Sequence, residues 1–142
     1  MRFIIMAGPG PNTTPPDPNA PFDEKLFATY MKFNEDLAKA GVLVASEGLS
    51  PAGAPAQVIV SNGQRIVTDG PYAEAKELVG GFYLIDVKSR EEAIQWALRS
   101  PCGFGFDDVL EIRQLTGGDD LPPHLLELIA KVAPTWWASI SK

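Results

Sequence analysis

Acidic side chains gather at one turn and near the end of one apolar segment, where carboxylates could do acid–base chemistry. The turn begins at Asp69 and is followed by Glu74 and Lys76, and the apolar segment ends near Glu47. A carboxylate held in a partly apolar pocket can act as a general acid or base, and a nearby lysine can orient an anionic substrate. Asp69 and Glu47 are therefore the candidate catalytic residues, and Glu74 and Lys76 are candidate substrate-binding residues.

Each of these residues also has a structural interpretation. An aspartate before Gly-Pro commonly accepts hydrogen bonds from the following amides, and the charges beyond the turn can form a solvated surface. Glu47 follows an apolar segment, residues 42–45, so it needs a partner or a water-filled cavity, although exposure at the end of a strand explains it equally well. Tyr30 and Tyr83 are candidate substrate-binding residues that could instead belong to the core.

Other kinds of site are poorly supported. The chain has one histidine, His124, and one cysteine, Cys102, which cannot assemble a zinc site within one chain, and it has no Asp-x-Asp-x-Asp calcium loop. The Gly-Pro-Gly after the first apolar segment has Thr13 where a dinucleotide loop needs its third glycine. A lone cysteine after a proline is typical of a small apolar residue, not of a nucleophile. We therefore expect neither a metal nor a cofactor.

The composition limits the class of protein and its partners. A chain of 142 residues fits one domain with an appended element. The formal charge of -6 would repel nucleic acid, and the N-terminal apolar run is too short for a signal peptide or a membrane span. A single cysteine fits a reducing compartment. The sequence therefore predicts a cytoplasmic protein that binds neither nucleic acid nor membranes.

Hydrophobic periodicity predicts an α+β fold. Apolar residues at helical spacing mark one helix that Gly41 ends, and Ser89 with Glu92 forms the capping box of a second. Asn62-Gly63 is a strong hairpin signal. The predicted order is strand 2–7, helix 26–37, strand 42–49, hairpin 57–68, strand 82–87, helix 89–101 and strand 109–115. This is a ferredoxin-like split βαβ arrangement with an antiparallel sheet and an inserted hairpin.

Two helices can cover only one face of such a sheet. Pairing two sheets face to face in a homodimer would cover the other, which predicts a dimeric α/β barrel. Residues 116–142 form a separate helical extension, in which Asp120 is predicted to cap a helix and Pro134 to interrupt it. Trp136-Trp137 lie on an apolar tail without a basic face, so we expect them to anchor the tail on the barrel or on the partner subunit.

One long motif resembles a known family. The segment TDGPYAEAKE, residues 68–77, followed by GGFYLI, residues 80–85, closely resembles the signature of the YCII-related family, specifically its DGPF-domain branch. Residues 41–49 and the helix 89–101 look like that family as well, and the resemblance covers residues 1–115. It implies a ferredoxin-like, dimeric α/β barrel.

The resemblance implies less about activity, because members are mostly of unknown function. Some are described as enzymes on the basis of a histidine on the first helix and an aspartate near the end of the second. Tyr30 and Ser100 occupy those positions here, so that dyad is missing. The leading hypothesis is a domain that binds a small organic molecule, with a possible carboxylate-assisted reaction. The alternative is a sensor or interaction module, such as a regulatory partner of a sigma factor, since some members are encoded beside sigma factors.

Overall fold

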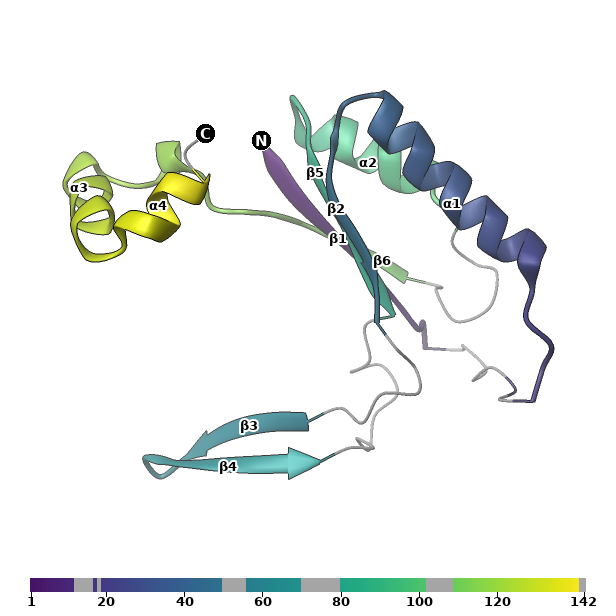
Figure 1. Cartoon of the computed structure of the whole chain (residues 1–142), viewed down its shortest axis with the longest axis horizontal. Helices are drawn as coiled ribbons and strands as arrows, with labels where there is room; N and C mark the ends of the chain where they lie inside the picture. Colours follow the sequence, from purple (N-terminus) through teal and green to yellow (C-terminus); the bar gives the residue numbers. More distant parts are fainter. Residues whose placement is uncertain (12–16, 18, 50–55, 70–79, 102–108, 141–142) are drawn as a thin grey trace.

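The structure is a computed structural model that describes residues 1–11, 17, 19–49, 56–69, 80–101 and 109–140. In these residues the chain forms an α+β fold with a helical tail (Figure 1). In chain order the elements are β1 (Arg2–Gly8), α1 (Glu24–Lys39), β2 (Leu43–Gly48), β3 (Ala56–Ser61), β4 (Gln64–Asp69), β5 (Gly81–Asp86), α2 (Arg90–Arg99), β6 (Val109–Gln114), η2 (Gly118–Asp120), α3 (Pro123–Val132) and α4 (Pro134–Ile140).

Four strands form one antiparallel sheet in the order β2-β5-β1-β6. β1 pairs with β5 on one side and β6 on the other, and β2 pairs with β5 at the edge. With α1 between β1 and β2 and α2 between β5 and β6, this is the ferredoxin-like order that the sequence predicts. The sheet places β1 and β5, far apart in sequence, side by side at its centre.

Local signals set the ends of the two helices that pack on the sheet. The Asp23 carboxylate accepts from the Leu26 amide at 3.0 Å, and Gly41 follows α1 with a φ of 71°. At α2 the Ser89 hydroxyl accepts from the Glu92 amide at 3.1 Å, and Glu92 accepts in return from the Lys88 amide at 2.9 Å. The predicted cap at Gly41 and the predicted helix start at Ser89 are confirmed.

Both helices lie on the same face of the sheet, and the core lies between them and the strands (Figure 1). Ile5, Ile85 and Leu37 are almost completely buried there, and the Phe33 ring meets Tyr83 edge-on at 5.2 Å between centroids. Edge-to-face pairs of this kind add to the energy of apolar burial. The other buried members are Phe3, Val87, Ala93, Trp96 and Ala97.

The opposite side of the sheet is here called the open face, after the half-buried side chains of Ile4, Met6, Phe82 and Leu84. These residues alternate along β1 and β5 with the buried core residues, and the strand register pairs Ile4 with Leu84 and Met6 with Phe82. In the described part of the chain no helix covers them (Figure 1). An apolar face without a cover is unusual for an antiparallel sheet, whose second face is normally polar.

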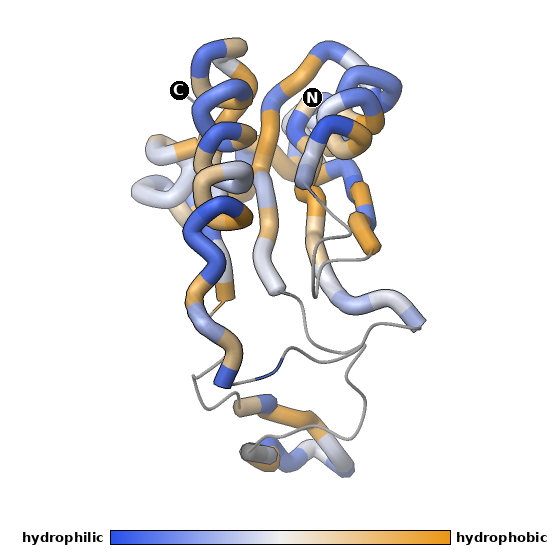
Figure 2. Tube along the Cα trace, turned by 90° about the vertical axis from the view of Figure 1, so that its right-hand side faces the viewer, coloured by the Kyte–Doolittle hydropathy of each residue, from blue (hydrophilic) through white to orange (hydrophobic). Residues whose placement is uncertain are grey.

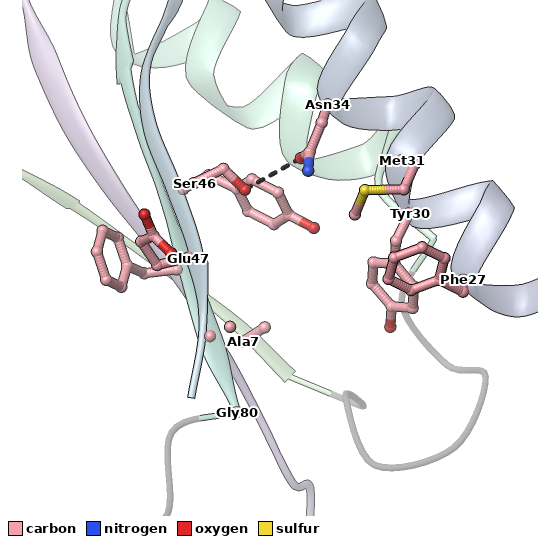
Figure 3. Close-up of a pocket in the computed structure, with 12 residues that line it drawn as sticks. Ala7, Phe27, Tyr30, Met31, Asn34, Ser46, Glu47 and Gly80 are labelled. Carbon is pink, nitrogen blue, oxygen red and sulfur yellow. Dashed lines mark hydrogen bonds between the residues drawn. The ribbon is translucent and has the colours of Figure 1, made fainter. Parts of the chain in front are cut away.

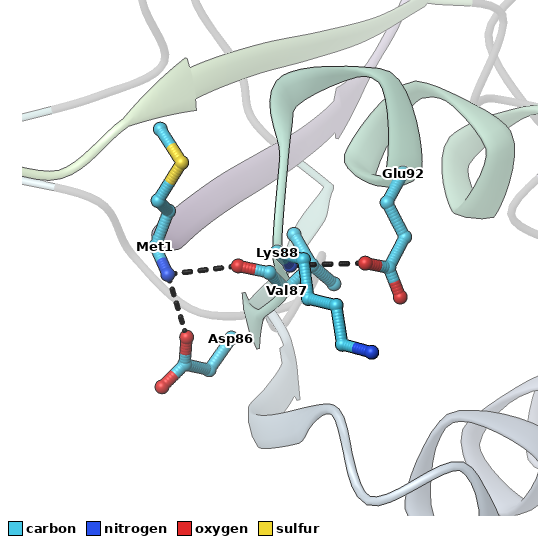
Figure 4. Close-up of polar contacts among 5 residues, drawn as sticks. All are labelled: Met1, Asp86, Val87, Lys88 and Glu92. Atoms are coloured by element: carbon cyan, nitrogen blue, oxygen red, sulfur yellow. Dashed lines mark hydrogen bonds and ion pairs between the residues drawn. The ribbon is translucent and has the colours of Figure 1, made fainter.

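The start of β1 is tied to the end of β5 (Figure 4). The Met1 amino group donates to the Asp86 carboxylate at 3.0 Å and to the Val87 carbonyl at 2.8 Å. Because both charged groups are largely exposed, this pair contributes little to stability.

The β3–β4 hairpin forms its own two-stranded sheet. Asn62 and Gly63 adopt φ values of 52° and 74°, which confirms the predicted turn. Its apolar side chains are exposed on both faces of the ribbon, and hydrophobic stretches run along it at the bottom of Figure 2. An isolated two-stranded hairpin is marginally stable in water, so this hairpin needs a cover. The exposed residues are Val58, Ile59, Val60, Ile66 and Val67.

The terminal helices α3 and α4 pack on each other and stand to one side of the sheet (Figure 1). The helix is interrupted at Ala133, just before Pro134, which begins α4; the sequence predicts this interruption at Pro134. The predicted helix cap at Asp120 is wrong: Asp120 ends the short helix η2, where its carboxylate accepts from the Gly117 amide at 2.6 Å. Pro122 occupies the cap position of α3 and supplies no side-chain bond. No described helix is both long and apolar enough to cross a membrane.

Candidate functional site

A cleft of about 480 Å³ opens between α1 and the end of the sheet (Figure 3). Its volume is within the range of small-molecule sites. One wall comes from α1, and the other comes from β1, β2 and β5. The lining residues are Ala7, Phe27, Tyr30, Met31, Asn34, Ser46, Glu47, Gly48, Gly80, Gly81, Phe82 and Tyr83.

The helix wall is a stripe of three large side chains and one amide. Phe27, Tyr30, Met31 and Asn34 follow one another at three- and four-residue spacing, which places them on one side of α1. Figure 3 shows these side chains pointing from α1 toward the sheet. Phe27 is 51% exposed and Met31 is 44% exposed, so large apolar surfaces face open space here and not the core.

The sheet wall adds neutral polar groups. The Ser46 hydroxyl donates to the Asn34 side-chain oxygen at 3.0 Å and so bridges the two walls (Figure 3). Both N–H groups of the Asn34 side-chain amide remain available as hydrogen-bond donors, because they bind no described residue. Tyr83, opposite Ser46 in the strand register, is 7% exposed and packs on Phe33 behind the cleft. The cleft therefore combines aromatic surface with hydroxyl and amide groups.

Glycines let the strands approach each other at the mouth of the cleft. Gly81 pairs with Gly48, and a Cβ built on Gly81 would lie 2.9 Å from the Glu47 carbonyl oxygen and 3.3 Å from the Gly48 Cα. Both neighbours are backbone atoms, so any side chain at this position would push β2 away from β5. The second glycine of the Gly80-Gly81 motif thus has a packing role at the site.

Glu47 borders the cleft through its backbone, while its side chain lies on the opposite side of the sheet (Figure 3). The cause is an irregularity in β2. The pairing with β5 shifts between Leu43 and Ala45, so Val44 is an extra residue and the alternation of side chains reverses beyond it. Ser46 consequently faces α1, and Glu47 is exposed beside Phe82 on the open face.

The other predicted site residues divide into two groups. Tyr30 and Tyr83 both line the cleft, and their role in substrate binding stays a prediction. Asp69 is the last residue of β4, and the position of its side chain lies outside the description. Glu74 and Lys76 fall entirely outside the described residues. The proposed roles of Asp69, Glu74 and Lys76 remain predictions.

Sequence reasoning missed Phe27, Met31, Asn34 and Ser46. A signal for the first three exists, because they flank Tyr30 at helical spacing and form a second stripe beside the core residues of α1. Ser46 carries no such signal, since its role depends on the shifted pairing of β2.

The described side chains of the cleft favour an uncharged ligand. Among these described lining residues Glu47 is the only carboxylate and points away, and there is no lysine, arginine or histidine. Among the described residues, no group of three or more potential metal ligands comes together. In the part that the structure describes, the cleft can hold and orient a molecule through aromatic contacts and neutral hydrogen bonds.

Comparison with known proteins adds a family and one relative. The model of the YCII-related domain matches residues 1–116. An uncharacterized protein of Rhizobium meliloti (strain 1021) is 40% identical over 75 residues, which are 53% of this chain. The match spans 60% of the length of that relative.

Proposed function

The chain belongs to the YCII-related family, and from this premise and the geometry of the cleft we propose that it binds a small, uncharged organic molecule between α1 and the sheet. The observation that carries the proposal is the lining itself. Phe27, Tyr30 and Met31 offer apolar surface, and the Asn34–Ser46 pair offers directed polar groups. Mostly apolar walls with a few convergent polar groups are typical of small-molecule sites.

Binding, as distinct from catalysis, is the function that the described residues support. A carboxylate-assisted reaction needs an acid whose side chain enters the cleft, and Glu47 points to the other side of the sheet. Any catalysis in this proposal therefore depends on Asp69 or Glu74. A protein that binds without turnover would be a sensor or carrier.

We also infer that the chain works as a homodimer through its open face. Ile4, Met6, Phe82 and Leu84 form an apolar surface that no described element covers. A second copy would cover it with an equally apolar surface, as a two-fold interface requires. This supports the dimeric barrel predicted from the two-helix, one-sheet arrangement.

An NMR screen of aromatic fragments, neutral and anionic, would test the proposed cleft. Neutral fragments that bear a hydrogen-bonding group should shift the signals of Tyr30, Asn34 and Ser46. Hits that cluster elsewhere, or anionic fragments that outcompete neutral ones, would contradict the proposal. A crystal structure of protein purified without added ligand would show any co-purified molecule in the cleft.

Two variants sharpen the screen. Asn34→Ala removes the polar contact from α1 and should weaken binding of a cleft fragment about five- to tenfold, the value of one neutral hydrogen bond. Gln95→Ala, on the exposed side of α2, removes a similar amide far from the cleft lining and should leave binding unchanged. Equal effects of the two variants would show that the fragment does not use the cleft.

A further inference from the structure

The terminal helices, Pro123–Ile140, here called the arm, carry an apolar stripe. Leu128, Val132, Trp136 and Ile140 recur at every fourth position, and they are 52%, 73%, 54% and 40% exposed. The pairing of α3 with α4 therefore leaves much of this stripe uncovered. Helices with such a stripe in soluble proteins normally bury it against another element.

The arm lies on the same side of the sheet as the open face, opposite α1 and α2 (Figure 1). The chain that leads to the arm stays paired with the sheet as far as Leu115, whose amide donates to the Arg2 carbonyl at 2.9 Å and continues the pairing beyond β6. The hairpin extends to this same side. Three apolar surfaces of one chain thus lie on the same side of the sheet, away from α1 and α2.

The surface area of the chain indicates that much of its surface lacks a cover. The chain exposes 10527 Å², whereas a folded monomer of 15.3 kDa exposes about 7,100 Å² by the scaling of surface with mass. The excess of about 3,400 Å² is large compared with the roughly 800 Å² that each partner buries in a standard interface. Part of this excess lies on the arm and the hairpin, which hold nine of the seventeen exposed large hydrophobic side chains.

The chemistry of the arm favours a second copy of the same chain over other partners. Its only charged side chains in the described helices are Glu127 and Lys131, so its partner surface must be apolar, and the open face is such a surface. A single lysine gives no basic face for an anionic membrane. At the edge of the open face, Glu111 and Arg113 expose both signs of charge on one strand, which is self-complementary across a two-fold axis.

We propose that the arm of each copy packs against the other copy, so that Leu128, Val132 and Trp136 are buried in the same interface as the open face. This inference rests on the proposed homodimer and extends it, because it makes residues 123–140 part of the interface. The exposure of Trp136 favours an interaction role for the tail. In this dimer the Trp136 side chain is buried against the second subunit.

Sedimentation equilibrium of the full chain tests the proposal with a matched pair of variants. Val132→Glu should raise the dimer dissociation constant at least about a hundredfold. In a two-fold dimer each copy carries the substitution, so two charged side chains replace two apolar ones in the interface. Leu98→Glu makes a comparable change at a residue that is also 73% exposed, but on α2, and should leave dimerisation unchanged. Trp136→Ser is a second arm variant, and circular dichroism confirms that each variant folds. Equal dissociation constants for Val132→Glu and wild type would overturn the proposal.

Acrylamide quenching in a Trp137→Phe background, where Trp136 is 54% exposed and the remaining Trp96 is only 8% exposed in the core, separates this proposal from the homodimer itself. We expect Trp136 to be protected only at concentrations where the chain is dimeric. Protection in the monomer would mean that the arm packs on its own sheet, and a quenchable Trp136 in a stable dimer would place the arm outside the interface. Both results overturn the arm proposal, and the second leaves the homodimer standing. A chain that is monomeric at all concentrations would overturn both, whereas cleft binding is measured independently by the fragment screen.

Discussion

The two faces of the central sheet are built from alternate residues of the same strands, yet they differ sharply in burial. On one face Phe3, Ile5 and Ile85 lie under α1 and α2 and are at most 2% exposed. On the other face Ile4 and Leu84, equally apolar, are only half-buried. A sheet with one solvated face would carry polar residues there. This sheet therefore has two apolar faces that need a cover, one covered by its own helices and the other, in our proposal, by a second copy of the chain.

The largest expected effect comes from neighbouring residues of β5 that point to opposite faces. Ile85→Ala should lower the free energy of unfolding by about 2–5 kcal/mol at every protein concentration, since it leaves a cavity in the core. Leu84→Ala should act mainly by weakening the dimer, so its effect should depend on protein concentration. Urea unfolding at several concentrations measures both. Identical, concentration-independent losses would break the comparison of the two faces.

A smaller effect is expected where β2 meets β5 at the cleft. Gly81→Ala should lower the free energy of unfolding by about 1–3 kcal/mol, because its Cβ would meet backbone atoms of β2. Gly48→Ala, at the paired position, has open space around its Cβ and is the matched control. Thermal unfolding compares the two variants, and fragment binding reports whether the cleft changes shape. A tolerated Gly81→Ala would contradict the close approach of the strands.

A substitution at the N-cap of α2 tests how much this cap contributes to the free energy of unfolding. Ser89→Ala removes the hydroxyl that accepts from the Glu92 amide and should cost about 1 kcal/mol in the free energy of unfolding. Ser61→Ala, on the exposed hairpin, should cost much less. Chemical denaturation followed by circular dichroism gives both values. A larger loss from Ser61→Ala would show that the hairpin matters more to stability than the cap of α2.

The smallest effect concerns the charged link between α1 and α2. The hydrogen bond from Lys32 lowers the pKa of Asp36 below 3.8, and Arg99, whose guanidinium lies 3.8 Å from the carboxylate, acts in the same direction. A lowered folded-state pKa stabilises the protein above pH 3.8, and this contribution is lost as the pH falls through the folded value. Asp36→Asn should therefore unfold at slightly lower urea than wild type near neutral pH and at the same urea at low pH. High salt should shrink the difference, and a large, salt-independent loss would contradict this account.

Much of the fold could be predicted because its signals are local. The period of apolar residues predicts the helices and strands, and Gly41, Ser89 and Asn62-Gly63 mark where α1, α2, β3 and β4 begin or end. The cap of α3 could not be predicted in this way, because Asp120 and its neighbouring glycines permit two alternative local bonds. Asp120 closes on Gly117 instead of capping the helix.

The candidate site was predictable only in part, for reasons of geometry. Tyr30 and Tyr83 could be named from the sequence because large aromatics on a helix and a strand commonly line the space between them. The Asn34–Ser46 pair could not, since two neutral residues on separate elements carry no mark of their contact. Their meeting depends on how α1 lies across β2.

The order of the elements, the apolar character of both faces of the sheet and the membership of the family follow from the amino-acid sequence alone, because each depends on a local pattern or motif. The direction of the Glu47 side chain follows only from the fold. One extra residue in β2, Val44, reverses the alternation of side chains beyond it, so Ser46 enters the cleft and Glu47 leaves it. A strand's pattern shows that its side chains alternate, but the pairing with β5 sets which of them face the helix.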